Sequence, residues 1–269
     1  MAEENAYILG TDSEELFRLG VQHQVWASEA QRGWGIAGFT AGQTLLDLGC
    51  GPGFCTKEMA LITGKSGRVI GIDKSVAYIN FLNDIKDTYG LNIDGHAVDF
   101  NQMQLEDNSL DGAYCRWAMA WISNPEEIIQ KVYKALKPGG RFVFHEYFHW
   151  MTHSTVPSYE NLSACIKGCF DSFEDFDGSI NIGRNLPEIC VNSGFTLFHT
   201  RPMAKTARVN DLAWQWPITF YKTYFNKLID MKYVTQEQVS LAFEELEDLS
   251  SRPDGLICCP LMIEIIVEK

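Results

Sequence analysis

The stretch Asp47-Leu48-Gly49-Cys50-Gly51-Pro52-Gly53 decides the fold of this chain. It follows an apolar run at residues 44–46 that is typical of a short buried strand, and it precedes residues 54–61, which favour a helix. A strand, a glycine-rich turn and a helix bring bare backbone close to a ligand, with free N–H groups of the helix directed at it. The stretch therefore predicts a ligand-binding turn at the end of a strand.

The spacing of the glycines narrows the choice of ligand. Their order is G-x-G-x-G, whereas the dinucleotide fingerprint is G-x-G-x-x-G. Pro52 also lacks the backbone N–H that a pyrophosphate-binding turn uses. The turn therefore favours a less charged, nucleoside-like ligand, and it disfavours a nicotinamide-dependent oxidoreductase.

The same stretch resembles the first motif of class I (Rossmann-like) S-adenosylmethionine-dependent methyltransferases. Further segments resemble motifs of that family in the family's order and at similar spacing. They are Val69-Ile70-Gly71-Ile72-Asp73, Ala97-Val98-Asp99-Phe100, Ser109 to Arg116, and Lys134 to Gly140. The resemblance covers residues 40–150 and implies a small-molecule methyltransferase that uses S-adenosyl-L-methionine and releases S-adenosyl-L-homocysteine.

Strand and helix signals alternate along the chain, which predicts a parallel sheet covered by helices on both faces. The expected strands lie near residues 44–48, 68–72, 93–98, 110–115, 141–147, 194–200 and 256–267. The expected helices lie near residues 12–32, 54–63, 76–88, 125–136, 211–230 and 235–250. Gly33 and the glycines after it are expected to end the first helix, and Asn124 is expected to cap the helix at 125.

The resemblance implies a doubly wound α/β fold. It has a seven-stranded, mostly parallel sheet whose last strand is antiparallel, with a helical cap and an insertion over the carboxyl ends of the strands. The expected parts are an N-terminal helical cap (1–40), the donor-binding core (41–150), an insertion or lid (151–185), and the rest of the core (186–269) with a helical cap at 205–250. Residues 150–185 are expected to build no sheet.

Composition limits the partners and the location. The 269 residues carry a formal net charge of −13, which would repel a phosphate backbone, so no nucleic acid is expected. No apolar run approaches the ~18 residues of a membrane span, and the first residues are acidic where a signal peptide is basic. The 8 cysteines form no C-x-x-C pair, which favours reduced thiols. We expect a cytoplasmic monomer or homodimer.

The resemblance assigns roles to groups around the methyl donor. Gly49 and Gly51 let the backbone approach its amino-acid end, and Asp47 lies within reach of its positive amino group. Asp73 follows Gly53 by 20 residues, the interval expected for an acid at the end of the second strand. A carboxylate there can accept hydrogen bonds from both ribose hydroxyls.

Asp99 with Phe100 resembles the adenine site of the family. Arg116 stands where a small or apolar residue is expected, so the role of its side chain is open. The other residues that the resemblance places at the donor are Tyr7, Gln22, Cys50, Lys74 and Cys115. Asp47, Asp73 and Asp99 also fit a purely structural role as caps of the turns in which they lie.

The stretch His145-Glu146-Tyr147-Phe148-His149 fits the H-E-x-x-H pattern of zinc proteases. That chemistry needs both histidines on one face of a helix. Here the residues follow Pro138-Gly139-Gly140 and favour a strand, along which four residues separate the rings by roughly 13 Å. No metal is expected. A metallohydrolase that uses these residues stays an alternative, as does a non-catalytic S-adenosylmethionine-binding protein.

Methyl transfer is an in-line displacement, and holding the acceptor against the methyl group in a dry pocket supplies much of the rate. The acceptor attacks through oxygen, nitrogen or carbon. A hydroxyl acceptor requires a base, for which the candidates are His145, Glu146, His149 and His23. Aromatic residues crowd the segment 214–225, which suits a buried core or a lid over a flat or apolar acceptor.

Overall fold

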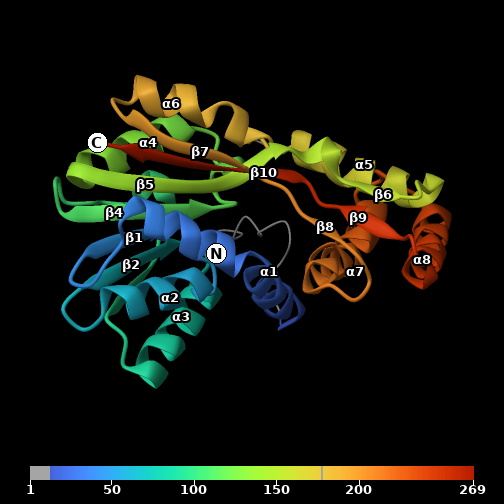
Figure 1. Cartoon of the computed structure of the whole chain (residues 1–269), viewed down its shortest axis with the longest axis horizontal. Helices are drawn as coiled ribbons and strands as arrows, with labels where there is room; N and C mark the ends of the chain where they lie inside the picture. Colours follow the sequence, from blue (N-terminus) through green and yellow to red (C-terminus); the bar gives the residue numbers. More distant parts are fainter. Residues whose placement is uncertain (1–12, 177) are drawn as a thin grey trace, which may run out of the picture.

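A seven-stranded sheet forms the centre of the molecule (Figure 1). The structure is a computed structural model, and it describes residues 13–176 and 178–269. The strand order is β3-β2-β1-β4-β5-β10-β7, with β10 antiparallel to both of its neighbours and the strands from β3 to β5 parallel. The strands are β1 (Thr44–Leu48), β2 (Arg68–Asp73), β3 (Ile93–Ala97), β4 (Leu110–Arg116), β5 (Leu136–His149), β7 (Thr196–Met203) and β10 (Leu261–Glu268). The predicted doubly wound fold is confirmed.

Helices cover both faces of this sheet, as Figure 1 shows. One face carries α1 (Ser13–Ala37), α2 (Phe54–Thr63) and α3 (Val76–Tyr89), and the other carries α4 (Pro125–Ala135) and α6 (Leu186–Asn192). Helices α2 to α4 and strands β1 to β4 match the predicted ranges to within one residue. Strand β5 begins earlier than predicted, at Leu136.

Separate apolar clusters lie on the two faces of the sheet. Leu46, Leu48 and Ile128 belong to the cluster under α4, whereas Leu45 and Met59 belong to the cluster under α2, and each is fully buried. Neighbouring residues on a strand point to opposite faces, so the continuous apolar run in β1 serves both clusters. Each such side chain contributes roughly 1.5–3 kcal/mol by leaving water.

A second, smaller sheet lies beyond the carboxyl ends of the parallel strands (Figure 1). Its strands are β6 (Ser154–Val156), β9 (Leu256–Cys258) and β8 (Thr206–Ala207), and the helices near it are α5 (Glu160–Glu174), α7 (Gln215–Asp230) and α8 (Gln236–Ser251). Two expectations are corrected here. Residues 256–267 form two strands in different sheets because Cys259 and Pro260 interrupt them, and the segment 150–185 does contribute a strand.

One expectation about a helix end is also wrong. Helix α1 does not stop at Gly33 but continues to Ala37, and Gly33 lies against the sheet, where a side chain would collide with Glu264. Asn124 is the N-cap residue of α4, as predicted, although its side chain makes no capping hydrogen bond. Within the described residues, no helix combines the length and apolar character that crossing a membrane requires.

Candidate active site

A large cavity with a volume of about 520 Å³ lies at the carboxyl ends of the parallel strands. In doubly wound sheets this edge is where ligands bind. Among its lining residues are Gln22, Asp47, Gly49, Cys50, Gly51, Asp73, Lys74, Asp99, Phe100 and Arg116. All of these were predicted from the sequence to surround the donor.

The glycine-rich turn shapes the floor of this cavity. Gly49 has a positive φ of 73°, and a side chain there would lie 2.3 Å from the Cβ of Ala118. Gly51 also has a positive φ, but a Cβ at Gly51 would meet no atom within 4 Å. Gly49 is therefore required by packing, whereas Gly51 leaves an open space beside bare backbone, which is what close approach of a ligand needs.

Asp73 ties the turn to the end of β2. Its Oδ2 accepts a hydrogen bond from the backbone N–H of Gly51 at 2.9 Å, and its Oδ1 accepts one from the N–H of Ser75 at 2.9 Å. Burial raises the pKa of this carboxyl, and the two N–H groups partly offset the rise. Asp73 therefore caps the turn, which is its structural role, and its carboxylate also lines the cavity.

Asp47 lies deeper, at the base of the same cavity. It is only 2% exposed, and its Oδ2 accepts a hydrogen bond from the Thr56 hydroxyl at 2.6 Å. Burial raises its pKa to about 6, although the Thr56 hydrogen bond and the Arg116 guanidinium act in the opposite direction. A cation bound beside this carboxyl would favour its charged form.

Asp99 and Phe100 lie at the far wall, after β3. The Asp99 Oδ1 accepts a hydrogen bond from the backbone N–H of Asn101 at 2.8 Å and begins the short 3-10 helix η1 (Phe100–Gln102). Asp99 is exposed, so its carboxylate keeps the hydrogen-bonding capacity that a turn cap does not use. The turn role and the predicted adenine role are compatible at this residue.

Arg116 connects the cavity to helices α1 and α2. Its Nη2 lies 3.3 Å from the Nδ1 of His23, and the Nε2 of that ring lies 3.0 Å from Glu58 Oε1. This arrangement fits a His23 tautomer that accepts from Arg116 and donates to Glu58. The side chain that departs from the family pattern therefore fastens α1 against the donor cavity.

One of the described residues that were predicted at the donor does not line the cavity in the structure. Cys115 is fully buried, with its Sγ 3.8 Å from Glu146 Oε1, and is not among the residues that line the cavity. Tyr7 lies outside the described residues. Strand alternation explains Cys115, because Arg116 next to it faces the cavity and its neighbour must face away.

The predicted bases need a correction. His145, Glu146, His149 and His23 line neither cavity. The Nε2 of His145 lies 2.9 Å from Glu264 Oε2, and burial lowers the pKa of this histidine. His145 lies on the face of β5 that packs against α1, and Glu146 lies on the opposite face, so neither reaches the site.

The H-E-x-x-H pattern does not form a metal centre in this structure. His145 and Glu146 lie on opposite faces of one strand, and Glu146 Oε1 accepts hydrogen bonds from the N–H groups of Ala118 and Met119 at 3.0 and 2.9 Å. In the part of the chain that the structure describes, no group of three His, Cys, Asp or Glu side chains is placed to hold a metal ion.

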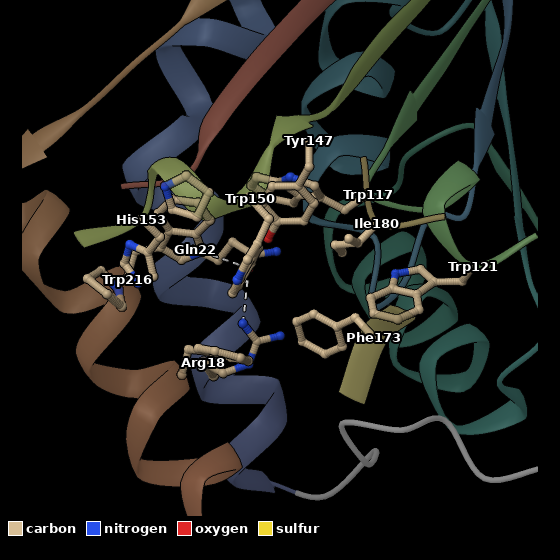
Figure 2. Close-up of a pocket in the computed structure, with 13 residues that line it drawn as sticks. Arg18, Gln22, Trp117, Trp121, Tyr147, Trp150, His153, Phe173, Ile180 and Trp216 are labelled. Atoms are coloured by element: carbon tan, nitrogen blue, oxygen red, sulfur yellow. Dashed lines mark hydrogen bonds between the residues drawn. The ribbon is translucent and has the colours of Figure 1, made fainter. Parts of the chain in front are cut away.

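A smaller cavity of about 50 Å³ adjoins the larger one, and Figure 2 shows the aromatic rings gathered around it. Gln22, Trp117 and Trp121 line both cavities and form the wall between them. The other lining residues with rings are Tyr147, Trp150, His153, Phe173, Trp216, Pro217, Phe220 and Pro260. We call this space the ring-lined cavity.

Trp117 has a backbone conformation that supports a role at this wall. Its φ is 54°, a value that bulky residues rarely adopt, and its N–H donates to the His145 carbonyl at 3.1 Å. Strain of this kind persists only where the surroundings impose it, and it concentrates at functional sites. Sequence reasoning missed Trp117, Trp121 and Trp150. Their position shortly after the fourth and fifth predicted strands could have indicated that they lie near the site.

Comparison with known proteins agrees with this geometry. Residues 39–179, slightly more than half of the chain, match the family described as "Methyltransferase domain". The chain belongs to this methyltransferase family. Its fold is that of the class I S-adenosylmethionine-dependent enzymes.

Individual relatives of this chain differ in what their names say they methylate. Sterol 24-C-methyltransferase of Saccharomyces cerevisiae is 25% identical over 81% of this chain and 57% of its own length. Demethylmenaquinone methyltransferase of Symbiobacterium thermophilum is 32% identical over 39% of this chain and 43% of its own length. The chain therefore spans about half the length of these curated relatives.

The solved structure of geranyl diphosphate C-methyltransferase from Streptomyces coelicolor is similar in fold to this chain, with a TM-score of 0.58. At 15% identity it covers 97% of this chain and 86% of the other. Such a low identity supports the shared fold and carries no information about the acceptor.

The larger cavity of this chain fits the donor of the family by its own chemistry. Gly51 offers bare backbone at the wall, Asp47 offers a buried carboxyl for a cation, and Asp73 offers an acceptor at the end of β2. Phe100 adds an apolar ring surface. This combination suits a nucleoside that carries a positively charged amino-acid part.

Proposed function

We propose that this chain transfers the methyl group of S-adenosylmethionine to a small-molecule acceptor. One observation carries the proposal. The residues that resemble donor-binding motifs, although far apart in sequence, line one cavity of about 520 Å³, and a ring-lined cavity adjoins it through a common wall. A donor site beside an acceptor site is the arrangement that in-line transfer requires.

In this proposal Asp73 accepts hydrogen bonds from the ribose hydroxyls, and Asp47 binds the positive amino group at the methionine end. Gly49 and Gly51 let the backbone approach the same end. The bound donor supplies a methyl group on a positively charged sulfur. The protein residues bind and orient it and exclude water, which is where most of their contribution to the rate lies.

Asp99 and Phe100 complete the proposed donor site on the adenine side. The Asp99 carboxylate would accept from the exocyclic amine, and the backbone N–H of Phe100 would donate to a ring nitrogen. Helices α1, α5 and α7 supply Gln22, Phe173 and Trp216 to the ring-lined cavity, which supports our proposal that the N-terminal helix and the segments 151–185 and 205–250 roof the acceptor site.

Location and partners follow from composition. Every cysteine of the chain is free in the structure, and all but Cys258 are buried, which fits a reducing compartment such as the cytoplasm. The net charge of −13 disfavours a nucleic-acid acceptor. We propose a small acceptor, apolar or aromatic, of which only a small part enters the ring-lined cavity, in a monomer or a homodimer alike.

Calorimetry with S-adenosylhomocysteine tests the donor site. We expect micromolar-range binding to the wild type and a loss of at least ~2 kcal/mol in Asp73→Ala, because two charge-assisted hydrogen bonds disappear. Asp94→Ala is the matched control, since Asp94 lies on the neighbouring strand β3, outside the cavity. Equal binding by wild type and Asp73→Ala would overturn the ribose assignment.

Turnover separates an enzyme from a protein that only binds the donor. Incubation with radiolabelled S-adenosylmethionine and a panel of alcohols, amines and alkenes should transfer label to at least one compound. Donor binding without transfer to any of them would favour the non-catalytic alternative.

A further inference from the structure

The ring-lined cavity contains few groups that could take a proton from an acceptor. Its one imidazole belongs to His153, whose Nδ1 lies 2.9 Å from the Cys258 carbonyl and whose Nε2 lies 2.6 Å from the Tyr221 hydroxyl. Because Nδ1 donates to the carbonyl, Nε2 accepts from the hydroxyl, and its lone pair is occupied. Burial lowers the pKa of His153 to about 4, which makes it a poor base.

The wall between the two cavities also lacks a base. Gln22, Trp117 and Trp121 form it, and an amide and two indoles do not accept protons near neutral pH. The guanidinium of Arg18 lines the ring-lined cavity, but its Nε and Nη2 each lie 2.7 Å from the carboxylate of Glu15, which offsets its charge. Tyr147 also lines the ring-lined cavity, but a phenol hydroxyl is a weak proton acceptor near neutral pH. Among the described residues, then, no carboxylate and no imidazole with a free lone pair lines the ring-lined cavity or the wall that it shares with the larger one.

Aromatic rings dominate the surface that remains. Phe173 makes edge-to-face contacts with Trp121 at 5.3 Å and with Trp150 at 5.2 Å between ring centroids. Trp150 in turn contacts Phe220 at 6.1 Å. A cavity lined by rings stabilises positive charge, because the face of each ring is electron-rich.

Methyl transfer moves the positive charge of the donor sulfur onto the acceptor, in the ring-lined cavity. We propose that the ring-lined cavity binds the unprotonated nitrogen of an amine acceptor, and that its aromatic rings stabilise the positive charge which methylation places on that nitrogen. The nitrogen lone pair forms the new N–C bond, and the S–C bond of the donor breaks with its electron pair kept by sulfur. The inference rests on the proposed function and specifies its acceptor.

Chemical alternatives fit this cavity less well. A hydroxyl acceptor must give up a proton during transfer, and a double bond becomes a carbocation that must lose one afterwards. An amine loses its proton to water before it enters, and a tertiary amine keeps its new charge as a stable ammonium. If each non-hydrogen atom needs the volume of one buried water, 50 Å³ holds about four such atoms. This is the size of a methylated nitrogen.

A pair of matched probes tests the inference. Choline carries a trimethylammonium group, and 3,3-dimethylbutan-1-ol has the same shape with carbon in place of the charged nitrogen. Both are titrated calorimetrically into protein saturated with S-adenosylhomocysteine, whose sulfur is uncharged. We expect choline to bind at least fivefold more tightly than the neutral alcohol, from one or more cation–π contacts.

Variants of one ring locate the binding. Trp121→Leu removes the indole and should reduce choline affinity at least fivefold, whereas Trp121→Phe keeps a ring face and should lose less. Because Trp121 lines both cavities, the S-adenosylhomocysteine affinity of each variant is measured first, and choline is then titrated into protein saturated with S-adenosylhomocysteine. Phe198→Leu is the control, because Phe198 is 45% exposed on β7 and lines neither cavity.

The outcomes distinguish this inference from the proposed function. Failure of S-adenosylhomocysteine to bind would overturn both. If it binds while choline and its neutral analogue bind equally, or neither binds, the amine inference is overturned and the donor site stands. An unchanged choline affinity in Trp121→Leu would also overturn it, because the cation would then lie elsewhere.

Discussion

Asp47 shows how burial can tune a binding residue. Its carboxyl has a pKa of about 6 instead of 3.8, since burial penalises the charged form. The group is therefore neutral below pH 6 and charged above it. If Asp47 binds the positive amino group of the donor, affinity must rise as pH rises through this range.

We predict that S-adenosylhomocysteine binds roughly tenfold more weakly at about pH 5 than at about pH 7.5, with the change centred near the pKa of Asp47. Calorimetry across this range measures it. Asp47→Asn should bind weakly and with little dependence on pH. A wild-type affinity that stays constant from about pH 5 to about pH 7.5 would contradict the role of Asp47, because the affinity is expected to change about tenfold over this range.

Glu146 presents the opposite case, a buried acid that is neutral at neutral pH. It is fully buried, Oε2 has no hydrogen-bond partner, and burial raises its pKa to about 8. The unfolded chain releases this proton near the ordinary value of 4.5, whereas the folded chain keeps it until about 8. Between these values the folded state binds more protons, so stability falls as pH rises.

The Glu146→Gln variant should remove this dependence. A glutamine oxygen can still accept from the N–H groups of Ala118 and Met119 and carries no charge. We predict a free energy of unfolding at about pH 8 that exceeds the wild-type value by at least ~2 kcal/mol, with a smaller difference at about pH 5. Urea denaturation at both values measures it, with the exposed Glu188→Gln as control. A difference that does not grow with pH would contradict the assignment.

At the scale of elements, helix α1 shows why glycine is a poor guide to a helix end. Gly33 and Gly35 both lie inside α1. A Cβ on Gly33 would lie 2.7 Å from Glu264 Oε2 and 3.1 Å from His145 Nε2, whereas a Cβ on Gly35 would meet nothing within 4 Å. The first glycine lets the helix approach the sheet, and the second faces open space.

The two glycines form a matched pair for mutation. Gly33→Ala should destabilise the protein by ~1–3 kcal/mol, because the methyl group forces the helix away from the buried, hydrogen-bonded side chains of His145 and Glu264. Gly35→Ala should stabilise it by ~0.5–1 kcal/mol through helix propensity alone. Denaturant unfolding of both variants measures this. Similar effects of the two substitutions would show that α1 does not pack on Glu264 as described.

Elements of the central sheet were predictable because each carries its own signal. Strands β1 and β2 are short runs rich in apolar residues, β1 is followed by a glycine turn and β2 ends in an acid, and these features act locally. The break at Cys259 and Pro260 depended instead on which sheet each half joins, which is a tertiary matter. The orientation of the His145 side chain is also a tertiary matter, because it depends on which face of β5 packs against α1.

At the scale of the whole molecule, the two cavities differ in how far the sequence reveals them. The larger one is built from strand ends, and motif resemblance located Asp47, Asp73 and Asp99 at its wall. The ring-lined cavity draws between one and three residues from each of α1, β5, α5, α7 and the turns after β4 and β5, and these residues form no motif. Trp216 and Phe220 lie in the aromatic segment 214–225, which is visible in the sequence. The other residues that line the cavity with them are identifiable only from the folded chain.

A ligand that bridges several elements must stabilise the whole chain, because it binds only the folded state. S-adenosylhomocysteine at one hundred times its Kd should add about 2.7 kcal/mol to the free energy of unfolding and raise Tm by roughly 5–10 °C. A thermal-unfolding scan measures it. Asp73→Ala at the same concentration should shift little, because its Kd is higher.

The nicotinamide dinucleotide NAD⁺ serves as the opposing ligand in this measurement. The turn from Gly49 to Gly53 has the wrong glycine spacing for a pyrophosphate, and Pro52 removes an N–H from it. NAD⁺ should therefore leave Tm unchanged at a concentration where S-adenosylhomocysteine raises it. A larger shift with NAD⁺ would mean that the cavity selects a dinucleotide, and the methyl-donor assignment would fail for the molecule as a whole.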